Sequence, residues 1–177
     1  MKLYEFTLKF SFPDEDFIDD IDELVERLGE AGGDDALVGI GKTGRLALDF
    51  SREAESAFDA ISSAIANVKT AIPEAKVTEA TPDLVGLTDV ADILGCSRQN
   101  MRKLMIKSGS NFPAPIYQGK SSLWHLFSVL SWLVDSRSYD VEEQLIDISR
   151  MNMHLNLARE LHDVDESLNK EVYRLVS

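Results

Sequence analysis

The stretch of sequence that decides the fold runs from Leu87 to Met105 and reads LTDVADILGCSRQNMRKLM. Apolar residues recur at helical spacing on both sides of Gly95, which supplies a tight turn between them. Thr88 and Ser97 begin the two apolar patterns, and their hydroxyl groups can accept backbone N–H groups as helix N-caps. The sequence therefore predicts a helix, a tight turn and a second helix.

The second predicted helix has an apolar side and a polar side. Met101, Leu104 and Met105 recur at helical spacing and form the side that faces inward. A helix-turn-helix places such a helix across the major groove of double-stranded DNA, so its outer side chains meet bases and phosphates. The outer side chains are of the types that read base edges or hold phosphates, namely Arg98, Gln99, Arg102 and Lys103.

The charge of the chain is distributed unevenly. Its 177 residues include 18 Lys plus Arg and 31 Asp plus Glu, a net charge of -13 that by itself argues against nucleic acid as a partner. Residues 1–83 hold 8 basic and 19 acidic residues, 84–137 hold 6 and 3, and 138–177 hold 4 and 9. Within 97–107 there are four cations and no acid, and Lys107 is the last of the four. This concentrated basic patch indicates a DNA-binding surface in the central segment.

The residues that follow carry a family resemblance. Phe112-Pro-Ala-Pro115 is followed by Ile116-Tyr-Gln-Gly-Lys-Ser-Ser-Leu-Trp124 and by Trp132. Together with the helix pair, this resembles the winged helix-turn-helix of the MerR, excisionase and prophage-regulator type over residues 86 to 135. The resemblance implies that the second helix enters the major groove and that a small hairpin lies beside the phosphates as a wing. By position, it implies DNA contacts from Ser97, Arg98, Gln99, Arg102 and Lys103 on the helix and from Gln118, Gly119, Lys120 and Ser121 on the wing.

The N-terminal segment alternates between strand and helix patterns. Apolar residues at every second position from Tyr4 to Phe12 predict a strand, and 17–28 predict a helix. Residues 36–40 and 45–50 flank turn residues and predict a hairpin. Ser51 is the expected N-cap of the next helix, with Ala54, Ala57, Phe58, Ile61, Ala64, Ile65 and Val68 as its apolar stripe, and 75–80 predict a last strand. The order βαββαβ resembles a ferredoxin-like sandwich, so the predicted class is α+β.

The C-terminal segment predicts one long helix or two. Apolar residues recur at three- and four-residue steps from Val141 to Leu175, although Asn152 and Arg159 interrupt a strict heptad pattern. The small central domain cannot cover a stripe of this length. The stripe must pack against the N-terminal domain or against a second copy of the chain, and we favour a homodimer formed through this segment.

These patterns predict three parts: an acidic domain at 1–83, a winged helix-turn-helix domain at 84–137 and a helical oligomerisation segment at 138–177. The predicted function is a sequence-specific DNA-binding transcriptional regulator. The alternative is an antitoxin-like or accessory protein whose acidic N-terminal surface binds a basic protein partner. No catalytic residue pattern, cofactor site or metal site stands out, so we expect no enzyme and no cofactor. Without a signal peptide, an apolar span or paired cysteines, we expect a cytoplasmic protein that does not enter the membrane.

Overall fold

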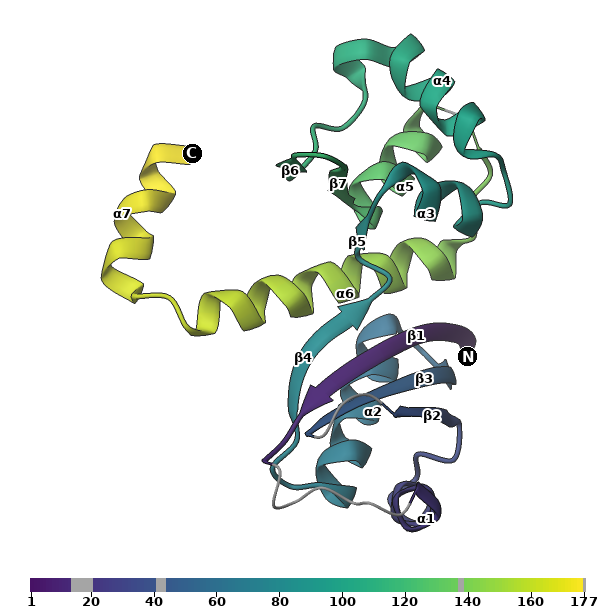
Figure 1. Ribbon diagram of the computed structural model, residues 1–177, viewed down its shortest axis with the longest axis vertical. Helices are drawn as coiled ribbons and strands as arrows, with labels where there is room; N and C mark the ends of the chain where they lie inside the picture. The colour runs from purple at the N-terminus through teal and green to yellow at the C-terminus, as the bar shows by residue number, and fades with distance from the viewer. Residues whose placement is uncertain (14–20, 41–43, 137–138, 177) are drawn as a thin grey trace.

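The computed structural model describes residues 1–13, 21–40, 44–136 and 139–176. Within these ranges the chain belongs to the α+β class, as predicted, with two antiparallel sheets and several helices. Figure 1 shows the two sheets toward opposite ends of the molecule, with the long helix α6 (Glu143–His162) passing between them. None of the helices in the described ranges has both the length and the hydrophobicity needed to cross a lipid bilayer.

The larger sheet belongs to the N-terminal part of the chain. Its strands are β1 (Lys2–Ser11), β2 (Ala36–Ile40), β3 (Arg45–Ala54) and β4 (Lys76–Thr81), in the antiparallel order β2-β3-β1-β4. Helices α1 (Ile21–Glu30) and α2 (Ala57–Ala71) complete the order βαββαβ. The predicted strands and hairpin are therefore confirmed. Parts of the predicted first helix (14–20) and of the hairpin turn (41–43) lie outside the described residues.

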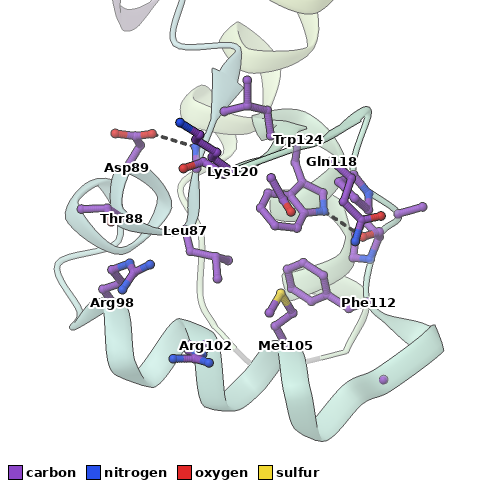
Figure 2. Close-up of a pocket in the computed structure, with 18 of the residues that line it drawn as sticks. Leu87, Thr88, Asp89, Arg98, Arg102, Met105, Phe112, Gln118, Lys120 and Trp124 are labelled. Carbon is purple, nitrogen blue, oxygen red and sulfur yellow. Dashed lines mark hydrogen bonds between the residues drawn. The ribbon is translucent and has the colours of Figure 1, made fainter.

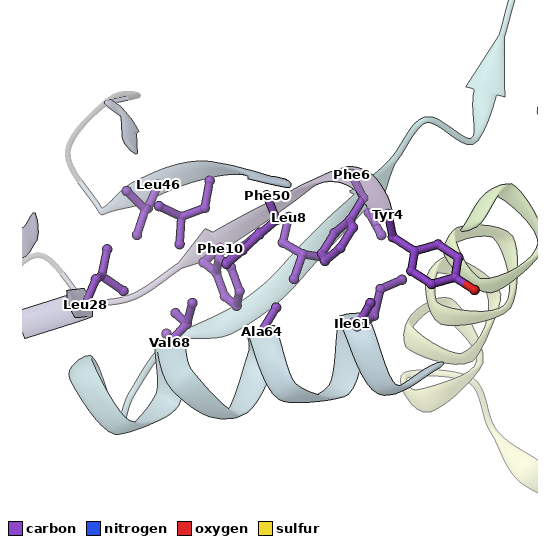
Figure 3. Close-up of a cluster of buried hydrophobic side chains, with 14 of the residues drawn as sticks. Tyr4, Phe6, Leu8, Phe10, Leu28, Leu46, Phe50, Ile61, Ala64 and Val68 are labelled. Carbon is purple, nitrogen blue, oxygen red and sulfur yellow. The ribbon is translucent and has the colours of Figure 1, made fainter. Parts of the chain in front are cut away.

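Alternation along the strands builds the N-terminal core. Tyr4, Phe6, Leu8 and Phe10 all point to one face of β1 and are at most 3% exposed. Figure 3 shows Phe6, Leu8 and Phe10 directed toward α2, and Tyr4 at the end of α2 that lies beside α6. Burial of large apolar and aromatic side chains of this kind is the main source of folding free energy.

The predicted N-cap at Ser51 is wrong. Strand β3 continues to Ala54, and Ser56 caps α2 by accepting the backbone N–H of Asp59 at 3.1 Å. The inward-facing series of β3 includes Arg52, whose guanidinium makes two hydrogen bonds of 2.6 Å to Asp35. Because a charged residue occupies an inward position, the apolar alternation of β3 is hidden in the sequence. The sequence pattern therefore predicts the start of α2 several residues too early. Two residues assigned to the buried stripe of this helix are not in it: Ala54 belongs to strand β3, and Phe58 lies on the exposed side of α2, where it is 62% exposed.

The central part contains the predicted helix pair. Helix α3 (Leu87–Ile93) and helix α4 (Arg98–Ser108) are joined by a turn in which Gly95 has a φ of 64°, a conformation that favours glycine. Ser97 caps α4 as predicted, since its hydroxyl accepts the N–H of Asn100 at 3.2 Å. Thr88 does not cap α3. The N-cap is Gly86, whose N–H donates to the Asp89 carboxylate at 2.7 Å.

A hairpin and one more helix complete this central unit. Strands β5 (Leu84–Val85), β7 (Ser122–His125) and β6 (Tyr117–Gln118) form an antiparallel sheet in that order, followed by α5 (Leu126–Asp135). Phe112 packs edge-on against Trp124 and Trp132, with ring centroids 5.9 and 5.0 Å away. The Trp124 indole donates to the carbonyl oxygen of Pro113 at 2.9 Å. These contacts fix the loop between α4 and β6.

The C-terminal stripe lies on two helices, α6 and α7 (Glu166–Val176). Leu145, Ile148, Met151 and Leu155 of α6 pack against the N-terminal core, and Leu145 also reaches the central core. The first half of the stripe is thus covered within the chain. The second half is exposed: Leu161 is 53% exposed and α7 has no buried residue. Figure 1 shows α7 extending away from the rest of the molecule.

A buried polar cluster joins the three parts of the chain. Asp83, only 2% exposed, lies 2.7 Å from Nδ1 of His125 in β7 and accepts a hydrogen bond of 2.7 Å from the amide of Asn156 in α6. Asn156 also pairs with both backbone groups of Ala80 at 2.8 Å. Asn152, one turn earlier on α6, donates to the carbonyl oxygen of Pro82 at 3.2 Å. The segment after β4 is therefore held by α6 on one side and by the hairpin on the other.

Asn156→Ala is expected to lower the free energy of unfolding by about 2 to 3 kcal/mol, because the backbone of Ala80 and the carboxylate of Asp83 lose buried partners. Urea denaturation measures the change. Asn169→Ala in α7 removes the same side chain from a helix outside the cluster and should change stability by less than about 0.5 kcal/mol. Equal effects of the two substitutions would show that the cluster contributes nothing specific.

Candidate nucleic-acid interface

A groove of about 940 Å³ lies between α4 and the β6–β7 hairpin. Its floor is apolar, with Leu87, Met105, Phe112 and Trp124 at the surface of the central core. Figure 2 shows Arg98 and Arg102 along α4, while Gln118 and Lys120 come from the hairpin. Two separate elements thus bring polar and cationic side chains to one depression.

Helical geometry divides the exposed surface of α4 into two rows. Met101 is fully buried, and Leu104 and Met105 are half-buried on the same side. At about 100° per residue, Arg98 and Arg102 lie next to this buried side, one turn apart, and both line the groove. Gln99, Ile106 and Lys103 lie on the side of the helix opposite the buried residues, and they do not line the groove. Helix α4 therefore has a groove-facing row and an outward-facing row.

The hairpin supplies the opposite wall of the groove. Gln118 ends β6, and Lys120 and Ser121 lie in the turn before β7. All three are exposed and line the groove. The ring of Tyr117 lies against Gly119, so close that a Cβ at Gly119 would come within 2.5 Å of its hydroxyl oxygen. The turn is therefore shaped by the Tyr117 ring as well as by the strand pairing.

The cations of this surface are unpaired. Arg98, Arg102, Lys103, Lys107 and Lys120 are all exposed, and none of them has an ion pair within 4.0 Å among the residues that the structure describes. Asp89 is the acidic residue of the groove lining, and its carboxylate accepts the Gly86 N–H. Unpaired exposed cations can bind an anionic ligand without first breaking an internal ion pair.

The structure brings some of the predicted residues together and separates others. Five of them line the groove: Arg98, Arg102, Gln118, Lys120 and Ser121. Gln99, Lys103 and Lys107 are exposed on α4 outside the groove, and the hydroxyl of Ser97 is engaged in capping the helix. The sequence interpretation missed Ile106, which is 63% exposed on the outward row. Its position seven residues after Gln99, two helical turns, is a signal that would have found it.

The described residues outside this surface offer few candidate metal-binding or reactive groups. In the described part of the chain, no cluster of three His, Cys, Asp or Glu side chains has an arrangement that could hold a metal ion. Cys96, half-buried in the turn between α3 and α4, shares a hydrogen bond with the Tyr139 hydroxyl. This bond and burial raise the pKa of Tyr139. The contact ties the helix-pair turn to the segment that leads into α6.

Comparisons of the chain with models of protein families, with curated proteins and with solved structures found no match. The geometry and charge of this surface are therefore the basis for proposing a function.

Ser97→Ala is expected to lower the free energy of unfolding by about 1 kcal/mol, because the first turn of α4 loses its side-chain cap. Ser121→Ala, at an exposed position in the hairpin turn, should change it by less than about 0.5 kcal/mol. Urea denaturation compares the two variants. A larger loss for Ser121→Ala than for Ser97→Ala would contradict the assignment of Ser97 as a structural cap.

Proposed function

We propose that this protein is a sequence-specific DNA-binding regulator that uses α4 and the β6–β7 hairpin. The observation that carries the proposal is the groove in which Arg98 and Arg102 face Lys120 across an apolar floor. An α-helix fits the major groove of DNA. Winged helix-turn-helix domains hold a duplex with one helix in this groove and a hairpin beside it.

We also propose a fold type for each of the two sheet-containing parts of the chain. We assign 84–137 to a winged helix-turn-helix, on the support of the α3–α4 pair, the three-stranded sheet and α5. We assign 1–83 to a ferredoxin-like sandwich. Its support is the order βαββαβ with antiparallel strands arranged β2-β3-β1-β4.

The local net charge indicates which part of the molecule contacts DNA in this proposal. Binding to phosphates is driven by counterion release to Lys and Arg, so it follows the local density of cations and not the net charge of -13. Residues 84–137 have a net charge of +3, whereas residues 1–83 have one of -11. We therefore place double-stranded DNA against the central unit only.

Arg98→Ala and Arg102→Ala are each expected to weaken binding to a selected duplex by on the order of tenfold and to lower the salt slope of log K by about 1, as expected for a lost phosphate contact. Fluorescence anisotropy over a range of salt concentrations measures both quantities. Lys69→Ala removes one exposed cation from α2 and serves as the control. If all three variants bind equally well, α4 is not the DNA-binding helix.

We further propose that α7 makes the protein a homodimer. An isolated 11-residue helix is marginal in water, and Leu168, Val172 and Leu175 of α7 are 56%, 44% and 83% exposed. Helix α7 carries two acids and two bases, so two copies do not repel each other as two other surfaces of this acidic chain would. A second copy would also supply a second DNA-binding unit, which raises affinity through effective concentration.

Leu168→Glu is expected to convert the dimer into a monomer at micromolar concentration, because it buries a charge in the proposed interface. Lys170→Gln changes the charge by the same amount on the opposite side of α7 and should leave the dimer intact. Light scattering after size-exclusion chromatography gives the mass of each variant. A monomeric wild-type protein would rule out α7 as a self-association helix.

A second candidate function is binding of a basic protein partner by the acidic N-terminal domain. A groove of about 880 Å³ between the outer face of the large sheet and the start of α6 supports it. Five carboxylate residues and no Lys or Arg line this groove among the described residues, together with the exposed Leu3 and Leu37. Purification from the native host separates the candidates: a defined set of DNA fragments favours the first function, and a stoichiometric basic protein favours the second.

A further inference from the structure

Ile106 is an exposed aliphatic side chain within the cationic surface of α4. It is 63% exposed and belongs to neither of the two hydrophobic clusters of the protein. Arg102 and Lys103 precede it by four and three residues, so both lie beside it on the helix surface. Packing within the chain therefore gives no reason for an isoleucine at this position.

The two rows of α4 predict different contacts with a duplex. Arg98 and Arg102 line the groove, and Lys120 of the hairpin lines its opposite wall. When α4 lies in the major groove of a duplex, the sugar-phosphate backbone of one DNA strand runs beside the helix and occupies the protein groove between α4 and the hairpin. Arg98 and Arg102 therefore meet phosphates. Gln99, Ile106 and Lys103 point away from the core, and this outward row meets the base edges at the floor of the major groove.

We infer that Ile106 is a specificity-determining residue that contacts the 5-methyl group of a thymine. This inference rests on the proposed function. The thymine methyl is the apolar group that base pairs present in the major groove, and aliphatic side chains recognise it by contact. The preferred duplex therefore contains an A·T pair beneath Ile106, flanked by bases within reach of Gln99 and Lys103. Arg98 and Arg102 hold the duplex in place but do not choose this base.

The test removes the methyl group from the DNA and the side chain from the protein, separately and together. Duplexes are first selected from a randomised pool with the full-length protein. Each thymine of the selected sequence is then replaced, one at a time, by deoxyuridine, which lacks only the 5-methyl group. For the wild-type protein, one replacement is expected to weaken binding about fourfold, as expected for one buried methyl group.

The variant Ile106→Ala should bind the thymine and deoxyuridine duplexes equally well, because the contact is already lost. Ile116→Ala removes a 52% exposed isoleucine from the loop before β6, outside the groove lining, and should retain the full deoxyuridine effect. Arg102→Ala should also retain it, with weaker binding overall. Circular dichroism confirms that the variants are folded.

Three results overturn the inference, and they show whether the proposed function fails with it. If the wild-type protein enriches a duplex but no deoxyuridine replacement weakens binding, or if Ile106→Ala retains the effect, Ile106 does not read thymine, while DNA binding stands. If no duplex is enriched at all, the proposed function fails and the inference fails with it.

Discussion

The carboxylate of Asp83 is the constraint on which the arrangement of this molecule depends. A carboxylate that is 2% exposed is strongly destabilising unless other groups bond to it, and here His125 and Asn156 do so from two different elements. The backbone carbonyl of Asp83 accepts the N–H of Leu126 at 2.7 Å, which ties the same residue to the start of α5. Asp83 lies between β4 and β5, so one short segment connects the large sheet, the hairpin sheet and α6. The hairpin that forms one wall of the candidate interface is thereby anchored to the N-terminal domain.

Helix α6 reinforces this connection, because its first half packs on the N-terminal core while Leu145 and Ile146 also reach the central core. The ring of Phe127 in α5 adds a contact with the guanidinium of Arg150, 4.8 Å from the ring centroid. A helix shared by two cores fixes the orientation of one unit relative to the other. In Figure 1, α4 and the N-terminal helices lie at opposite ends of the molecule. The N-terminal helices are thus on the side of the molecule away from the cationic helix α4.

The parts of the fold that follow from local patterns could be predicted, and the parts that depend on distant partners could not. A few neighbouring residues are enough to predict three features: the strand alternation that begins at Tyr4, the Ser97 cap and the turn at Gly95. The same reasoning failed at Arg52, because its buried partner Asp35 is 17 residues away. It also treated Asn152 as an interruption of an apolar stripe, whereas that side chain donates to the backbone 70 residues earlier. For the candidate interface, composition identified the cationic residues of α4 and helical spacing separates them into two rows, but only the position of the hairpin shows which row faces the groove.

If α4 binds DNA as proposed, its two rows account for how an acidic protein is selective for particular duplexes. In the proposed function, the net charge of -13 opposes general attraction to a polyanion, so few duplex contacts form away from α4 and the hairpin. Arg98, Arg102 and Lys120 would then supply a small number of phosphate contacts, enough to set the register but too few for tight binding without sequence preference. The remaining free energy of binding would come from the outward row of α4, where the side chains are the amide of Gln99, the aliphatic group of Ile106 and the ammonium group of Lys103. In the proposed function, selectivity follows from this balance, because most of the affinity beyond the phosphate contacts would depend on the identity of the bases.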